Sequence, residues 1–338
     1  MRMLRILGLV LLGVALAAVT GWGVLALHYS DIANAPARTG LAVAFGLAGA
    51  ATLTALVSAR WRWRALAGFV AIFAALIAWW GTIAPSNDRV WRSEEAALPF
   101  ATFEGDLVTV HNIRNFDYRS ETDFTPAYYD RTFDLRELIS VDLIAAYWMG
   151  PAIAHVFLSF GFAGGDHLAI SIEARKERGE GYSSIKGFFK QYELYYVVAD
   201  ERDVIRVRTN YRHEPPEDVY LYRLHGSTEN ARRLFSEYLK KINALKVRPE
   251  FYNTLTTNCT GNIWLHSMVN PGHPPFSWKI LLSGYVPEYL YEVGRLDTGL
   301  PFAELRQRAQ INAQARAADG AEDFSRRIRE GLPDVGPH

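Results

Sequence analysis

The single cysteine of the chain, Cys259, lies where its thiol could act as a nucleophile. It follows Thr257 and Asn258, which are favoured N-cap residues, and an apolar run over 263–269 comes soon after it. This order predicts a helix that begins at Cys259, where the partial positive charge of the helix start favours the thiolate. The alternative is a buried thiol that only packs as a small apolar side chain.

A cysteine nucleophile needs a base, and the base needs an orienting group. His155 lies within an apolar segment, 153–162, that reads as a strand, so a buried ring there needs hydrogen-bond partners. A Gly-Gly turn at 164–165 predicts a hairpin that places position 155 opposite 173–174. We expect Glu173 to orient His155 while the other side of the ring faces Cys259. The residues expected on the same face of the return strand are Ala169, Ser171, Glu173 and Arg175.

Other interpretations of these residues stay open. His155 could be a core histidine, with Glu173 and Arg175 as an exposed charge pair. His167, next to Asp166 at the turn, is a competing base, although turn histidines are usually solvated. His266 lies two turns along the cysteine helix, about 10 Å away from the thiol.

The region around these residues predicts an α+β fold, with an antiparallel sheet first and helices packed on it afterwards. Strand-like segments are followed by an amphipathic helix over 228–245 and the cysteine helix over 259–269. Residues 301–338 are charged and alanine-rich and predict a C-terminal helix or tail. The predicted strands are 106–112, 139–148, 153–162, 167–174, 192–199 (a central strand) and 219–224.

The first 85 residues contain three uncharged apolar stretches of about 20 residues each. A helix of this length can span a lipid bilayer. The stretches cover about 6–27, 39–58 and 65–84. We expect three retained transmembrane helices, since the first apolar core is too long for a typical cleaved signal. The expected organisation is therefore 1–85 in the membrane, a thiol domain over 86–300, and the C-terminal segment 301–338.

Arginines set the expected orientation in the membrane. Arg2 and Arg5 precede the first span, and Arg60, Arg62 and Arg64 fill the loop between the second and third spans. Because positive residues stay cytoplasmic, we expect a cytoplasmic N-terminus and a periplasmic domain after the third span. This corresponds to the bacterial inner membrane.

The residues from His155 onward resemble the periplasmic N-terminal domain of Lnb-type lipoprotein N-acyltransferases. The similar segments are 155–162, Ser171-Ile172-Glu173-Ala174-Arg175, 192–194, 201–203, and 252–260 with Asn253, Asn258 and Cys259. The resemblance spans about 95–300 and implies a permuted papain-like, NlpC-like fold with the histidine before the cysteine. In this chain the predicted spans precede the domain, whereas the family name describes an N-terminal domain.

The resemblance implies a periplasmic thiol acyltransferase or hydrolase that acts on lipid or lipoprotein acyl groups. His155 and Cys259 correspond to the histidine and cysteine of the family, and Glu173 to its acidic residue. Asn258 and Asn253 are candidate oxyanion donors, and Ser171 and Arg175 candidate supports. The expected partners are membrane lipids and lipoproteins, with no cofactor and no metal.

Two alternatives have other chemistry or none. A cysteine amidase or peptidase on cell-wall peptides would use the same pair. A non-catalytic, membrane-anchored envelope module would lack contact between His155 and Cys259, and would use Arg114, Tyr118, Arg119 and Arg202 for anions. Basic and acidic residues number 36 each, so bulk charge does not indicate nucleic acid.

Overall fold

The computed structural model describes residues 2–333 and divides into two compact units. The first unit comprises the chain up to Ser86 together with Tyr182–Tyr192. The second comprises Asn87–Gly181 and the chain from Glu193 onward.

The first unit contains three helices, as the apolar stretches predict: α1 (Arg2–His28), α2 (Ala35–Ala55) and α3 (Arg62–Thr82). Two of them, Met3–His28 and Arg62–Thr82, are long and apolar enough to cross a membrane. α2 is not among these two, because Arg38 and several glycine and threonine residues make it less apolar. Three helices are therefore present, but two rather than three qualify as candidate spans in the described residues.

The helices of this unit pack through large apolar side chains and close backbone approaches. Phe45, Phe69 and Leu76 are buried between them. Gly49 lies against Thr20, and a Cβ at position 49 would come within 2.3 Å of that side chain. α1 and α2 therefore approach closely where a larger residue would push them apart.

The segment Tyr182–Tyr192 belongs to this helical unit although it connects two strands of the second. It contains η3 (Lys186–Phe188). Lys190 Nζ donates hydrogen bonds to the carbonyls of Trp80, at 2.8 Å, and Ile83, at 3.0 Å. Phe189 stacks on Tyr29 with ring centroids 5.6 Å apart. The connection is therefore fixed at the ends of α1 and α3.

The second unit is built on an eight-stranded sheet with the order β1-β2-β9-β8-β7-β6-β10, and with β5 paired to β2. Every pairing is antiparallel except a single parallel contact between β2 and β9. The fold is the predicted α+β arrangement, and each predicted strand is present. The strands are β1 (Phe100–Glu104), β2 (Leu107–Arg114), β5 (Tyr128–Asp134), β6 (Leu138–Tyr147), β7 (Ala154–Phe162), β8 (His167–Arg175), β9 (Glu193–Asp200) and β10 (Asp218–Arg223), beside a small hairpin of β3 (Asp117–Tyr118) and β4 (Phe124–Thr125).

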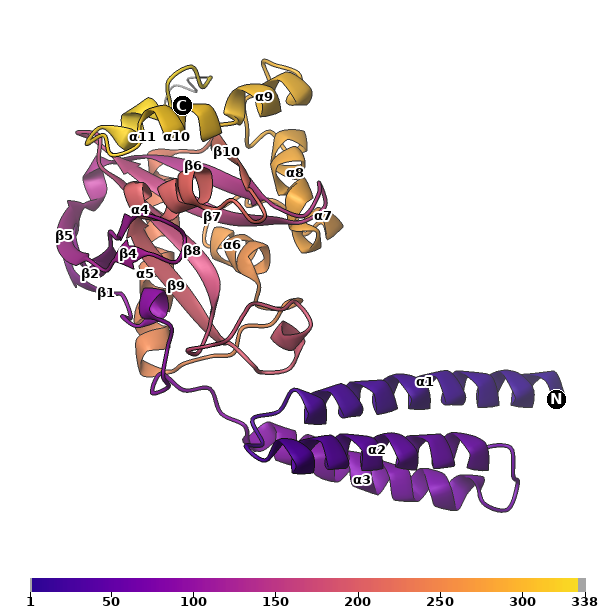
Figure 1. The fold of residues 1–338 in the computed structure, drawn as a ribbon. Helices are drawn as coiled ribbons and strands as arrows, with labels where there is room; N and C mark the ends of the chain where they lie inside the picture. Colours follow the sequence, from indigo (N-terminus) through magenta and orange to yellow (C-terminus); the bar gives the residue numbers. More distant parts are fainter. Residues whose placement is uncertain (1, 334–338) are drawn as a thin grey trace. The chain divides into compact units, whose positions relative to one another are not determined.

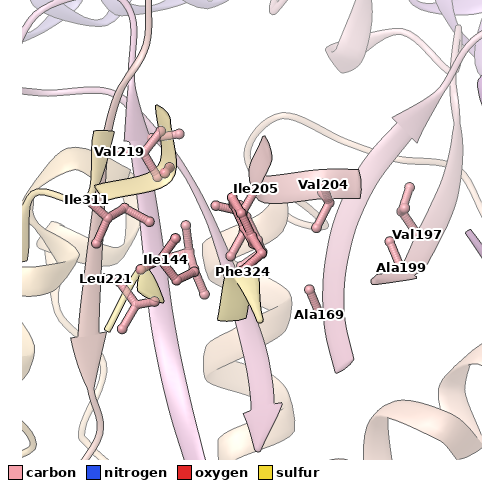
Figure 2. Packing of buried hydrophobic residues seen from close by; sticks show 14 of the residues in the cluster. Ile144, Ala169, Val197, Ala199, Val204, Ile205, Val219, Leu221, Ile311 and Phe324 are labelled. Carbon is pink, nitrogen blue, oxygen red and sulfur yellow. The ribbon is translucent and has the colours of Figure 1, made fainter. Parts of the chain in front are cut away.

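Helices cover both faces of this sheet (Figure 1). On one face, α5 packs Phe235 against Phe160 and Tyr238 against Tyr196. The other face carries a core that includes Ile144, Phe157 and Ala169 (Figure 2). Strand side chains alternate between the two cores, as the period of two requires. The helices are η1 (Ser93–Glu95), η2 (Leu135–Glu137), α4 (Glu201–Arg206), the π-helix η4 (Val207–Tyr211), α5 (Thr228–Val247), α6 (Cys259–Ser267), α7 (Trp278–Leu281), η5 (Ser283–Tyr285) and α8 (Val286–Glu292).

The C-terminal segment, expected as a charged helix or tail over 301–338, forms three short helices that belong to the core of this unit. They are α9 (Phe302–Ala309), α10 (Asn312–Ala317) and α11 (Phe324–Arg327). Ile311 and Phe324 are fully buried in the core (Figure 2). Arg329 donates hydrogen bonds to Asp142 and Glu201, both buried. Residues 334–338 of the expected tail lie outside the described residues.

Candidate active site

The site forms where two neighbouring strands of the sheet separate. The ladder between β7 and β8 runs from Leu158, paired with Ile170, to Gly161, paired with His167. β7 nevertheless begins at Ala154 and β8 continues to Arg175. The unpaired ends leave a gap in the sheet, and α6 packs against both strands there.

Cys259 is the first residue of α6, as its sequence context predicts. Asn258 is the N-cap, and its Oδ1 accepts a hydrogen bond from the backbone N–H of Gly261 at 2.7 Å. The thiol lies close enough to His155 and to the backbone of Val156 for both to lower its pKa. The N–H of Val156 takes no part in the ladder between β7 and β8, because the paired residues of β7 begin only at Leu158. The gap therefore gives a thiol from a helix on one face access to an imidazole on the other face.

The hairpin brings Ser171 and Glu173 to His155, as its register predicts. His155 Nε2 lies 2.6 Å from Ser171 Oγ and 3.0 Å from Glu173 Oε1. Ser171 in turn donates to the same carboxylate oxygen at 2.8 Å. Since Nε2 is engaged by these two groups, Nδ1 is the ring nitrogen left for the thiol. The imidazole thus lies between Cys259 and a carboxylate, the order that activates a cysteine nucleophile.

The charges of this site stabilise a thiolate–imidazolium pair. Burial lowers the pKa of His155, but the negative charge of Glu173, together with the interactions of the ring with Cys259 and Glu173, outweighs burial and raises that pKa to about 9. Burial raises the pKa of the Cys259 thiol, but the hydrogen bond and charge of His155 outweigh it and lower that pKa below its ordinary value. Burial also raises the pKa of Glu173, yet His155 and Arg208 hold it well below its usual range. The shifts of His155 and Cys259 both favour the thiolate–imidazolium form of the pair.

Arg208 also belongs to the site, although the sequence did not predict it as a site residue. It lies in the π-helix η4, is almost fully buried, and donates to Glu173 Oε1 at 3.1 Å. Its other terminal nitrogen donates to Glu217 at 3.2 Å. An arginine flanked by apolar residues, as in the sequence Val204-Ile205-Arg206-Val207-Arg208, is a signal of a buried, paired guanidinium. Arg208 fixes the carboxylate that orients His155.

The remaining predicted residues hold the chain around the site. Asn253 Oδ1 accepts from the backbone N–H groups of Leu255, at 2.9 Å, and Thr256, at 3.1 Å. Arg175 lies under Trp91, 4.0 Å from the ring centroid, and donates to the carbonyls of Glu95 and Ala96. The side chains of Asn258 and Asn253 are thus engaged in capping and turn contacts, and Arg175 holds the segment before β1.

The competing histidines have other surroundings. His167 Nδ1 lies 3.0 Å from the carbonyl of Gly165, within its own turn. His266 is buried against Tyr238 and lies 2.7 Å from Tyr196 Oη, and burial lowers its pKa to about 4. Among the described residues no cluster of three or more histidine, cysteine, aspartate or glutamate side chains could hold a metal ion.

The residues considered for anion binding form ion pairs within the fold. Arg114 forms a two-pronged contact with Asp203, and Tyr118 donates to the same carboxylate at 3.3 Å. Arg119 pairs with Asp123, and Arg202 with Asp200 at 3.0 Å. Each guanidinium therefore already has a carboxylate partner.

The fold and the site define a membrane-associated α+β protein with a partly buried thiol–imidazole pair. Residues 124–284 match the model of the Lnb N-terminal periplasmic domain, so this part of the chain is similar to that domain. The match extends from β4 to η5 and contains His155, Ser171, Glu173, Arg208 and Cys259. No curated protein and no solved structure gives a significant match. The domain and the apolar N-terminal helices fit an inner-membrane protein with a periplasmic domain.

Proposed function

We propose that this protein is a membrane-tethered periplasmic thiol acyltransferase that moves acyl groups from a lipid ester through Cys259. The observation that carries this proposal is the placement of Cys259 beside His155, whose Nε2 lies 3.0 Å from Glu173 Oε1. A non-catalytic envelope module has no need for such a contact. A partly buried carboxylate that holds an imidazole beside a thiol instead fits covalent catalysis.

In the first step the thiolate of Cys259 attacks the carbonyl carbon of the ester, and a C–S bond forms. The tetrahedral intermediate then collapses, the C–O bond breaks, and the imidazolium of His155 donates its proton to the leaving alkoxide. The products are an S-acyl cysteine and an alcohol, which is the deacylated lipid. Glu173 stabilises the imidazolium before this transfer.

In the second step an amine attacks the thioester carbonyl, and neutral His155 takes the proton that the nitrogen loses. The C–S bond breaks, and the thiolate–imidazolium pair forms again as the amide leaves. The amine of a lipoprotein N-terminus is the acceptor that the family implies. Water in place of the amine would make the protein a hydrolase.

Backbone groups are the best candidates to stabilise the oxyanion of the intermediate. The N–H of Cys259 lies at a helix start, where it has no partner within the helix. The backbone of Val156 lies close to the sulfur. Both are rigidly held close to the reacting atom, as electrostatic stabilisation requires. The amide groups of Asn253 and Asn258 are weaker candidates, since each has other partners.

The order of the site residues supports a permuted papain-like fold. The histidine lies on β7, its polar partners lie on the neighbouring β8, and the cysteine begins the later helix α6. We also propose that α1, α2 and α3 all cross the inner membrane, with the N-terminus in the cytoplasm. The helices would keep the site near lipid, where acyl donors are concentrated.

The direct test replaces the nucleophile. In a strain that lacks its own copy of the gene, Cys259→Ser should abolish acylation of lipoprotein N-termini, read by mass spectrometry of those peptides. The wild-type protein should carry an added acyl mass on Cys259 that hydroxylamine removes. Thr256→Ser, at an exposed position three residues earlier, is the matched control. Normal acylation with Cys259→Ser would refute the transferase proposal.

A further inference from the structure

A cavity of about 450 Å³ lies beside the site, on the face of the sheet opposite the His155 ring. Its strand residues Val141, Leu143 and Leu158 alternate with Ile144 and Phe157, which face the other core. The cavity is lined by β6, β7, the first turns of α5, the length of α6, and α8. Its volume lies in the range of small-molecule sites, about 300–1,000 Å³.

The cavity begins next to the nucleophile. Cys259 does not line it, but Thr260, the next residue, does, and so does Ile263, one helical turn beyond the thiol. From Thr260 to Ser267 the cavity follows α6 for about 10 Å. The cavity therefore begins within one helical turn of the sulfur.

The lining predicts an aliphatic ligand. The walls near Thr260 are formed by branched aliphatic side chains from strands and helices on every side. Polar side chains gather where α5 begins and α6 ends, with Asn230, Ser267 and Asn270 among them. An apolar space of this size binds hydrocarbon more favourably than water. The aliphatic wall residues are Leu143, Leu158, Leu234, Ile263, Ile280 and Val286.

The outer surface of the same segment indicates that this hydrocarbon comes from a bilayer. Residues 255–282 form one wall of the cavity and also expose an unusual number of large apolar side chains. Trp278 and Phe276 are more than half exposed, at 56% and 57%. Such a surface is costly in water and suits a lipid interface. The exposed residues are Leu255, Leu265, Met268, Val269, Phe276, Trp278, Leu281 and Leu282.

We infer that this cavity holds the acyl chain of the lipid donor while the carbonyl carbon lies at Cys259. The inference rests on the proposed acyl transfer and adds a binding site for the chain. Polar residues form the end of the cavity away from Thr260, and the aliphatic walls stop there. The cavity should therefore limit the length of the acyl chain that the enzyme accepts.

The test uses substitutions that fill part of the cavity and leave Cys259, His155 and Glu173 unchanged. Ala231 on α5 lines the cavity, whereas Ala244 on the same helix is exposed. Ala231→Phe should exclude part of the chain, and Ala244→Phe is the matched control. Both are made in full-length Cys259→Ser protein in lipid nanodiscs, with a photoreactive palmitic acid as the probe. Cross-linking to cavity peptides should fall roughly tenfold with Ala231→Phe and stay unchanged with Ala244→Phe.

A second arm uses the active protein and reads the acyl masses on Cys259. Ala231→Phe should shift these masses toward shorter chains. Ser267→Leu narrows the cavity from the α6 side and repeats the test if Ala231→Phe does not fold. Unchanged cross-linking and chain lengths in a folded cavity variant would overturn the inference and leave acyl transfer standing. Cavity cross-linking without any S-acyl cysteine would instead support the cavity and refute the transferase.

Discussion

The imidazole of His155 is influenced by two neighbouring charges, Glu173 and Arg208, that act in opposite directions. Glu173 stabilises the imidazolium, while Arg208, which holds the same carboxylate, destabilises it. The balance leaves the pKa of His155 at about 9, above its ordinary 6.5. The thiolate–imidazolium pair should therefore persist until the pH passes about 9, where the imidazolium loses its proton.

This balance predicts opposite pH shifts for two substitutions. The alkylation rate of Cys259 by iodoacetamide should rise near pH 9, because an unpaired thiolate is a stronger nucleophile. Glu173→Gln should move this rise to lower pH, and Arg208→Met to higher pH, each by about one unit or more. Because Cys259 is the only cysteine, mass spectrometry of the intact protein measures the rate directly.

Arg202→Met is the control, since Arg202 pairs with Asp200 and has no contact with the site. Arg208→Met should also lower the free energy of unfolding by about 1–3 kcal/mol, because it removes one hydrogen-bond partner from both Glu173 and Glu217. Shifts in the same direction for Glu173→Gln and Arg208→Met would contradict the proposed electrostatics.

Local sequence signals were enough to predict that Cys259, His155 and Glu173 lie close together. A cap motif positions the cysteine, and a Gly-Gly turn fixes which residues of the return strand share a face with the histidine. The same alternation put Arg175 on that face, and its contacts with Trp91 depend on an irregular segment before β1. The sequence does not predict the position of Arg208 in the site. This residue lies in a π-helix, which gives no amphipathic pattern in the sequence.

At the scale of elements, the separation of β7 and β8 creates the site, and η5 holds the free end of β7. Ser283 Oγ accepts a hydrogen bond from the N–H of Ala154 at 3.0 Å, and the N–H of Gly284 donates to the carbonyl of Ala152 at 3.0 Å. The strand start just before His155 is therefore fixed by a turn that lies 129 residues later in the chain. The sequence could predict both strands, because their apolar patterns are local, but not where their pairing ends.

Gly284 provides a test of this clamp. A Cβ at this position would lie 2.1 Å from the carbonyl oxygen of Pro151 and 2.7 Å from the carbonyl carbon of Ala152. Since backbone atoms cannot turn aside, Gly284→Ala should displace the start of β7 and cost about 1–3 kcal/mol. Thermal unfolding should show the loss, and alkylation of Cys259 near neutral pH should slow as His155 moves.

Gly226→Ala is the matched control, since a Cβ there meets no atom within 4 Å. It should leave both the unfolding temperature and the alkylation rate unchanged. A Gly284→Ala protein with unaltered alkylation would show that η5 does not position the histidine.

At the scale of the whole molecule, the chain passes between its two units three times. It leaves the helical unit at Ser86, returns to it at Tyr182, and leaves again after Tyr192. The connection between β8 and β9, two strands of the eight-stranded sheet, is therefore part of the unit that contains the apolar helices. A soluble fragment from Asn87 onward would lose the contacts that fix Lys190 and Phe189.

The membrane arrangement depends on α2, the least apolar of the three helices. If α2 crosses the bilayer, the loop before it and the loop after it lie on opposite sides. The arginines at 60, 62 and 64 should hold the second loop in the cytoplasm. In a Cys259→Ser background, Ala33→Cys should then react with a membrane-impermeant maleimide added to intact spheroplasts. Arg60→Cys should react only after the membrane is permeabilised.

Leu107→Cys, at an exposed position of the periplasmic unit, is the control for labelling from outside. It should react in intact spheroplasts to the same extent as Ala33→Cys, because both positions are proposed to face the periplasm. If Ala33→Cys and Arg60→Cys label alike, α2 lies along the membrane surface and the proposed three-span topology is wrong. If Arg60→Cys labels from outside and Ala33→Cys does not, the orientation is reversed, because the arginine-rich loop would then face the periplasm.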